Sequence, residues 1–215
     1  MYFLDPNSYQ FPDPRLANAD DILAIGGDLS PKRLIHAYQH GIFPWFNEGD
    51  PIIWYSPAWR MVLDPRHYKP SKSLQQLIKK NHFHITYNQH FKEVITQCKT
   101  ISRNDGLGTW ITDDMLQSYL KLHQLGHAKS VEVWQENKLV GGLYGVDLGH
   151  IFCGESMFSH VSNASKIAFN WLNNYLITKK YDLLDCQVHN SHLESLGAYE
   201  IPREEFLHIL HKKKN

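Results

Sequence analysis

The spacing of hydrophobic positions changes along this 215-residue chain, and the changes divide it into segments. Residues 1–60 are rich in proline and irregular, and they contain one well-marked helical pattern, "GGDLSPKRLIHAYQHG". Ser30 is a suitable N-cap for that helix, Pro31 stands at its first position, and Gly41 can end it in a left-handed conformation. We interpret this part as a small N-terminal domain.

Helical spacing returns after residue 70, with one short strand inside it. "SKSLQQLIKKN" reads as a helix and "HFHITYN" as a strand, after which Asn88 can cap a helix through "QHFKEVITQCKT". A further helix is predicted in "TDDMLQSYLKLHQLG", where Thr112 is the cap, acidic residues occupy the first turn and Gly126 marks the end.

From residue 130 the pattern becomes that of strands. Three apolar runs separated by turn residues, in "KSVEVWQENKLVGGLYGVDLGHIFCGESMF", predict a β-meander. A helix is expected over residues 163–179, followed by the strand "YDLLDCQVH", the segment "SHLESLG" and the helical "PREEFLHILHKKK". This order predicts an α+β fold with helices packed on a mostly antiparallel sheet.

Composition and charge narrow the class of protein. A hydrophobic fraction of 42% and a charged fraction of 20% fit a globular chain, and 22 basic residues balance 22 acidic ones. With no net charge, contact with nucleic acid depends on local patches. Three cysteines without C-x-x-C spacing indicate a reducing compartment. With no signal peptide and no run of about 18 apolar residues, we expect a cytoplasmic protein without a membrane partner.

One stretch, "GIFPWFNEGDPIIWYSP", collects aromatic residues between prolines. Taken alone, its aromatic side chains are expected in the hydrophobic core.

Familiar catalytic motifs are missing. Fourteen histidines raise the question of a metal site. His36 and His40 are four residues apart, but the glutamate of H-E-x-x-H is missing between them, and the other pairs have no clear third ligand, so no metal is expected. G-x-S-x-G and the phosphate-binding G-x-x-x-x-G-K-[ST] are also absent, which argues against a hydrolase or a P-loop enzyme.

Polar residues inside apolar strands are more informative. Strand alternation in "YDLLDCQVH" predicts Asp185 and Gln187 on one face, roughly 7 Å apart. Glu155 stands among apolar neighbours in "IFCGESMF", where a buried carboxylate needs a partner. These residues could orient an amine or a carbonyl group, or they could lie at an edge and face solvent.

A longer set of motifs resembles a known family. In chain order they are "GGDLSP", "AYQHGIFPWF", "GDPIIWYSP", "GTWIT", "LHQLGHAKSVEVW", "LVGGLYGV", "FCGESMFS", "NASK", "LLDCQV", "HLESLGA" and "EIPREEF". They are similar to those of the bacterial leucyl/phenylalanyl-tRNA–protein transferases, and they cover nearly the whole chain.

The resemblance implies an enzyme that works without a cofactor. Leu or Phe, and less readily Met, would pass from Leu-tRNA or Phe-tRNA to the N-terminal Arg or Lys of an acceptor protein, marking it for N-end rule degradation. The implied fold is a small N-terminal domain, residues 1–60, and a domain similar to the N-acetyltransferases (GNAT-like), residues 61–215, in a monomer.

Roles for individual residues follow from the resemblance alone. Asp185 and Gln187 match a proposed catalytic pair in which the aspartate orients the glutamine toward the attacking amine. Glu155 and Asn190 match polar residues that contact substrate, and Trp45 and Trp110 match aromatic residues that hold the terminal adenosine of the tRNA. The implied side-chain pocket contains Leu143, Phe152, Phe169, Leu172 and Leu176, and the implied tRNA-binding lysines are Lys72, Lys79 and Lys80.

Two other functions compete with this interpretation. An acyl-CoA-dependent N-acetyltransferase would need a [QR]-x-x-G-x-[GA] loop, but the equivalent segment "FSHVSNASK" contains no glycine. A non-enzymatic binder of RNA or of protein N-termini would show no catalytic defect when Asp185 or Gln187 is replaced.

Overall fold

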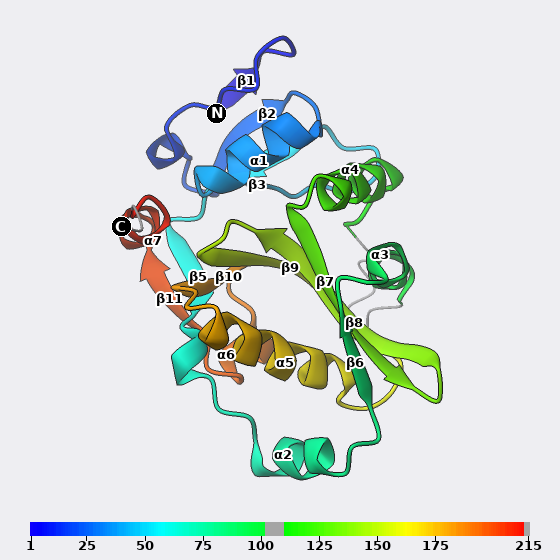
Figure 1. Ribbon diagram of the computed structural model, residues 1–215. Helices are drawn as coiled ribbons and strands as arrows, with labels where there is room; N and C mark the ends of the chain where they lie inside the picture. The colour runs from blue at the N-terminus through cyan, green and yellow to red at the C-terminus, as the bar shows by residue number, and fades with distance from the viewer. Residues whose placement is uncertain (102–109, 213–215) are drawn as a thin grey trace.

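Two β-sheets organise the chain in the computed structural model, which describes residues 1–101 and 110–212 (Figure 1). The smaller sheet belongs to the first 55 residues and has the strand order β1-β2-β4-β3. Its strands are β1 (Tyr2–Leu4), β2 (Ile22–Gly26), β3 (Phe43–Pro44) and β4 (Ile53–Tyr55), and helix α1 spans Pro31–Gln39. The sequence pattern predicts the helix but not these strands, because prolines and turns leave each strand too short to show alternation.

The larger sheet has seven strands in the order β11-β5-β10-β9-β8-β7-β6. The pair β9–β10 is parallel and the other neighbouring pairs are antiparallel. The prediction of a mostly antiparallel sheet, with a meander in its middle, is therefore confirmed. Its strands are β5 (Trp59–Leu63), β6 (His84–Tyr87), β7 (Ala128–Gln135), β8 (Lys138–Asp147), β9 (Ile151–Ser159), β10 (Leu183–Gln187) and β11 (Tyr199–Pro202).

Helices cover both faces of the larger sheet (Figure 1). Two adjacent glycines of β8 show the two faces: a Cβ on Gly141 would meet Ala164 of α5 (Ala164–Thr178), whereas one on Gly142 would meet Val94 of α3 (Phe91–Thr100). The fold is therefore an α+β layer structure, as the sequence predicts. Its remaining helices are α2 (Lys72–Lys79), α3 (Phe91–Thr100), α4 (Asp113–Gln124), α5 (Ala164–Thr178), α6 (Ser191–Glu194), α7 (Arg203–Leu210) and the short 3-10 turns Pro14–Leu16 and Pro65–His67.

Helix caps show how far local sequence decides local structure. Ser30 accepts a hydrogen bond from Arg33 N, Thr112 accepts one from Met115 N, and Gly41 follows α1 with a φ of 73°, so these predictions are confirmed. The predicted Asn88 cap is wrong. Helix α3 begins after His90, while the backbone N–H of Asn88 donates to Ser130 O of β7. The predicted continuation of α7 through Lys213 and Lys214 lies outside the described residues.

The boundary expected at residue 60 falls within β5, a strand of the larger sheet. The two sheets share no strand among the described residues, so we keep a division near this point as a proposal. No helix in the described part of the chain is long and apolar enough to span a bilayer.

Most aromatic side chains of the stretch after Gly41 are buried. Trp54 is fully buried, and its indole N–H donates to Gly26 O at 2.8 Å, so it is a packing residue. Trp45 differs, because 43% of its surface is exposed. Trp45 is therefore the exposed indole of this stretch, while Phe43, Phe46 and Trp54 lie in the core.

Candidate active site

A cavity of about 420 Å³ opens where β3 and the residue after it, Trp45, meet β8, β9, β10, α5 and α6. Its inner wall is apolar and includes four residues of the predicted side-chain pocket: Leu143, Phe152, Phe169 and Leu172. The fifth, Leu176, is fully buried in the same hydrophobic cluster but does not line the cavity. It lies one turn beyond Leu172 on α5, so the same helix face carries it past the cavity into the core.

Glu155 is the carboxylate on the wall of this cavity. Its Oε1 accepts hydrogen bonds from the Tyr38 hydroxyl at 2.7 Å and from the Gln187 amide nitrogen at 2.8 Å, and its Oε2 accepts one from the Tyr119 hydroxyl at 3.0 Å. Burial raises the pKa of Glu155 to about 7, against the lowering effect of these three donors. Burial also raises the pKa of both tyrosines, so both hydroxyls are donors at neutral pH.

Gln187 reaches the cavity through an irregular strand end. The pairing of β10 with β5 shifts register between Asp185 and Gln187, and Gln187 has a φ of 67°. The simple alternation that put Asp185 and Gln187 on one face is therefore wrong. Gln187 lines the cavity, whereas Asp185 is fully buried outside it.

Asp185 is paired with an arginine that the sequence analysis missed. Arg60 of β5 donates from Nε to one carboxylate oxygen at 2.8 Å and from a terminal nitrogen to the other at 2.7 Å. Asp185 Oδ1 also accepts from the backbone N–H of Gln187 at 2.9 Å. Asp185 thus fixes the backbone of Gln187, while Glu155 holds its side-chain amide. A single arginine inside the apolar strand "WRMVL" was the sequence signal that could have revealed this partner.

Arg60 is itself enclosed. Its guanidinium lies 4.7 Å from the centre of the Phe43 ring and 4.6 Å from that of Phe206, and it donates to Gly41 O at 3.2 Å. The pair therefore links β5 and β10 to the segment that carries Trp45.

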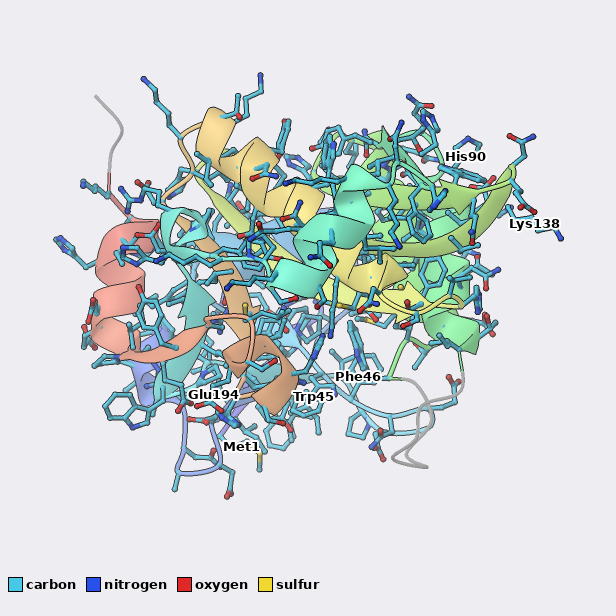
Figure 2. The ribbon with its side chains drawn as sticks, turned by 90° about the horizontal axis from the view of Figure 1, so that it is seen from below. Met1, Trp45, Phe46, His90, Lys138 and Glu194 are labelled. Atoms are coloured by element: carbon cyan, nitrogen blue, oxygen red, sulfur yellow. The ribbon has the colours of Figure 1, made fainter. Side chains whose placement is uncertain are left out.

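Two indoles line the outer part of the cavity. The backbone N–H of Trp45 donates to Ile53 O at 2.9 Å, which fixes its position beside β4, and its ring lies 5.8 Å from that of Tyr55. Trp110 also lines the cavity, although Gly108 and Thr109 of its motif lie outside the described residues. Trp45 and Glu194 of α6 lie toward the same side of the molecule (Figure 2).

Asn190 follows β10, and its backbone N–H donates to Met61 Sδ of β5 at 3.2 Å. It caps α6 by accepting a hydrogen bond from Leu193 N at 3.1 Å, and it also lines the cavity. His189 and His192, which no sequence motif singles out as site residues, line the cavity beside it.

Cysteine chemistry does not fit this site. Burial raises the pKa of the Cys153 and Cys186 thiols, so both stay protonated at neutral pH. A thiolate nucleophile is therefore not expected here, although Cys186 lines the cavity.

The three predicted tRNA-binding lysines lie elsewhere. Lys72, Lys79 and Lys80 are exposed on and just after α2, which stands at the end of the molecule opposite the smaller sheet (Figure 1). They do not line the cavity.

Comparison with known proteins agrees with the motifs. A family model described as "Leucyl/phenylalanyl-tRNA protein transferase" matches residues 62–211, and the model of the corresponding N-terminal domain matches residues 27–58. The leucyl/phenylalanyl-tRNA–protein transferase of Flavobacterium johnsoniae is 57% identical over 213 residues, covering 99% of this chain and 100% of the relative. That of Photobacterium profundum is 49% identical over 213 residues, covering 98% of this chain and 89% of the relative.

Among solved structures, an aminoglycoside acetyltransferase from an uncultured soil metagenomic sample has a TM-score of 0.39 and 15% identity, covering 63% of this chain and 91% of that one. The sequence matches are far stronger, since a family model spans most of the chain and close relatives align over almost all of it. This chain belongs to the leucyl/phenylalanyl-tRNA–protein transferase family.

Proposed function

We propose that this protein transfers Leu or Phe, and less readily Met, from aminoacyl-tRNA to the N-terminal Arg or Lys of an acceptor protein. The proposal extends the function named for its relatives to this chain. The observation that carries it is the position of the Gln187 amide, which Glu155 holds at the wall of an apolar cavity. The alternative of acetyl transfer from acyl-CoA is not favoured, because these relatives are named as tRNA–protein transferases.

The apolar wall suits the side chain of the transferred amino acid. Leu143, Phe152, Phe169 and Leu172 offer no hydrogen-bonding side-chain group, so they select by size and shape. A hydrophobic pocket separates substrates that differ by one methylene by only about 1–3 kcal/mol. Acceptance of Leu, Phe and Met by one pocket follows from that limit.

Gln187 is proposed to aim the attacking amine. Because its amide nitrogen donates to Glu155, its amide oxygen is the atom that would accept a hydrogen bond from the acceptor's α-amine. That amine has an ordinary pKa of about 7.7–8.0, so a fraction is neutral at pH 7 and needs orientation more than a strong base. A neutral amide cannot serve as the base itself.

Every bond that forms or breaks in the proposed reaction, and the proton that moves, belongs to the two substrates. The amine nitrogen bonds to the ester carbonyl carbon, the carbon–oxygen bond to the ribose breaks, and the departing ribose oxygen takes up a proton from the amine. The protein's part is to position the groups and to exclude water, which suits a site whose polar residues are already held by hydrogen bonds.

Asp185 acts in this scheme as a positioning residue. It fixes the Gln187 backbone and is not exposed to the cavity. Trp45 and Trp110 would stack on the terminal adenosine, and Lys72, Lys79 and Lys80 would contact the RNA farther away. We also propose that the protein acts as a monomer in the cytoplasm and that its products enter N-end rule degradation.

The decisive test supplies both substrates. The protein is mixed with Leu-tRNA and a peptide that begins with Arg, and mass spectrometry is used to look for the addition of one leucine. The matched control peptide begins with Glu and is otherwise identical. Absence of leucine on the Arg peptide, or acetylation of that peptide when acetyl-CoA replaces Leu-tRNA, would overturn the proposal.

A second measurement tests the role of Gln187. Gln187→Ala should lower kcat with little change in the unfolding midpoint, because Gln187 is only partly buried. Gln97→Ala is a suitable control, since Gln97 bonds His160 on the surface away from the cavity. An unchanged kcat in Gln187→Ala would remove this residue from the mechanism.

A further inference from the structure

The rim of the cavity continues past the residues that the proposed reaction uses. After β10 the chain enters the short helix α6, and His189, Asn190 and His192 of this segment line the cavity. Glu194 is the last residue of α6, and its Oε2 lies 3.4 Å from Nε2 of His189. A carboxylate therefore stands directly beside the rim, on the side of the molecule that carries Trp45 (Figure 2).

Hydrogen bonds fix the position of α6 relative to the cavity. The backbone N–H of Asn190 is bonded to Met61 Sδ of β5, and the Asn190 side chain caps the helix. The backbone N–H of Glu194 donates to Asn190 O at 2.9 Å. Glu194 is thus held close to the strand end that carries Gln187, while its own side chain remains largely exposed.

The carboxylate inside the cavity is already engaged. Among the described residues that line the cavity, Glu155 is the only Asp or Glu, and there is no Lys or Arg. The two oxygens of Glu155 already accept hydrogen bonds from Tyr38, Tyr119 and Gln187. A cationic side chain that enters the cavity therefore finds no free carboxylate on its wall, and the first carboxylate after Gln187 in the chain is Glu194.

The contact between Glu194 and His189 is one that a stronger cation can replace. More than half of each side chain is exposed, and exposed pairs of this kind contribute little to stability. A guanidinium is always charged and can donate two parallel hydrogen bonds to one carboxylate. Burial and the nearby charge of Lys166 lower the pKa of His192, so this imidazole adds little positive charge at neutral pH, and Lys166 is the cation that opposes a second one.

We propose that Glu194 binds the cationic side chain of the acceptor's N-terminal residue and thereby contributes to the preference for Arg or Lys. The inference rests on the proposed function, in which the amide oxygen of Gln187 receives the α-amine of the acceptor. With the amine held there, the long side chain of the first residue extends to the rim, where its charged end takes the place of His189 beside Glu194. Glu194 is a specificity residue in this arrangement and takes no part in bond formation.

Steady-state transfer of leucine to two acceptor peptides tests this. Glu194→Gln removes the charge and keeps the shape, so the KM for a peptide that begins with Arg should rise by about fivefold at low salt, with the KM for Leu-tRNA unchanged. The rise should shrink at higher salt, because screening weakens an exposed ion pair. The second peptide begins with citrulline, in which an uncharged urea group replaces the guanidinium. Its inhibition constant against transfer to the Arg peptide should be the same for the variant and the wild type.

The matched control is Glu93→Gln, which removes the carboxylate of another exposed His–Glu pair, His90 and Glu93, also 3.4 Å apart and away from Trp45 (Figure 2). An unchanged KM for the Arg peptide in Glu194→Gln, an equal rise in Glu93→Gln, or an equal weakening of the citrulline peptide overturns the proposal. A rise in the KM for Leu-tRNA alone assigns Glu194 to the RNA and overturns it too. Failure of the proposed function is distinguishable, because the wild type would then transfer no leucine to the Arg peptide.

Discussion

Removal of either member of the Arg60–Asp185 pair should strongly destabilise the protein. Arg60 is 2% and Asp185 0% exposed, and two short hydrogen bonds join them. Arg60→Met leaves a buried carboxylate that has lost both of its bonds to the guanidinium, and Asp185→Leu leaves a buried guanidinium without its carboxylate. Loss of one partner of a buried pair costs about 3–5 kcal/mol, a large share of a total stability of about 5–15 kcal/mol.

The cost should fall when both charges are removed together. In Arg60→Met combined with Asp185→Leu no isolated charge remains, so we expect much of the free energy of unfolding to return. Equilibrium unfolding in urea measures all three variants, with the midpoint and slope compared. Arg15→Met is the control, because the Arg15–Glu204 pair is exposed and its loss should leave the midpoint nearly unchanged.

This experiment also decides how to interpret activity lost on substitution of Asp185. If the single variants lose less than about 1 kcal/mol, or if the double variant is as unstable as their sum, the pair is not the buried structural link described here. If the double variant is stable but slow, its defect does not come from unfolding, which is the result expected if Asp185 positions Gln187.

Three further predictions follow from the cavity. Burial raises the pKa of Glu155 from its ordinary value of 4.5 to about 7, so the stability that this group contributes is fully present below pH 4.5 and is lost as pH rises through 7. Glu155→Gln should therefore flatten this part of a plot of the unfolding midpoint against pH. A plot that is the same for the variant and the wild type would contradict this prediction. Trp45→Ala should raise the KM for Leu-tRNA by the equivalent of about 1–3 kcal/mol, the contribution of one stacked base, with little loss of stability. Trp54→Ala should instead lower the free energy of unfolding by about 3–5 kcal/mol. Equal losses of unfolding free energy in the two variants would refute this distinction. Leu172→Ala should shift transfer toward Phe by enlarging the cavity, whereas Leu176→Ala should cost about 2–5 kcal/mol of stability and leave the Leu-to-Phe ratio unchanged, as competition assays can show.

Local sequence determined the elements whose signals lie within a few residues. Ser30 and Thr112 cap their helices as predicted, and the turn at Glu136 and Asn137 joins two meander strands, because capping and turn formation depend on neighbouring backbone groups. The motif resemblance likewise selected Gln187, Glu155 and several other residues of the cavity wall.

Only the tertiary structure decided how the selected residues are held. Arg60 meets Asp185 across 125 positions of the chain, and Tyr38 meets Glu155 across 117. The irregular end of β10 turns Gln187 away from the face of Asp185, against simple alternation. These contacts depend on packing between segments that are distant in the sequence. Burial makes an unpaired charge costly, so a buried charge needs a partner, but the residues next to it in the sequence do not show which distant side chain will be that partner.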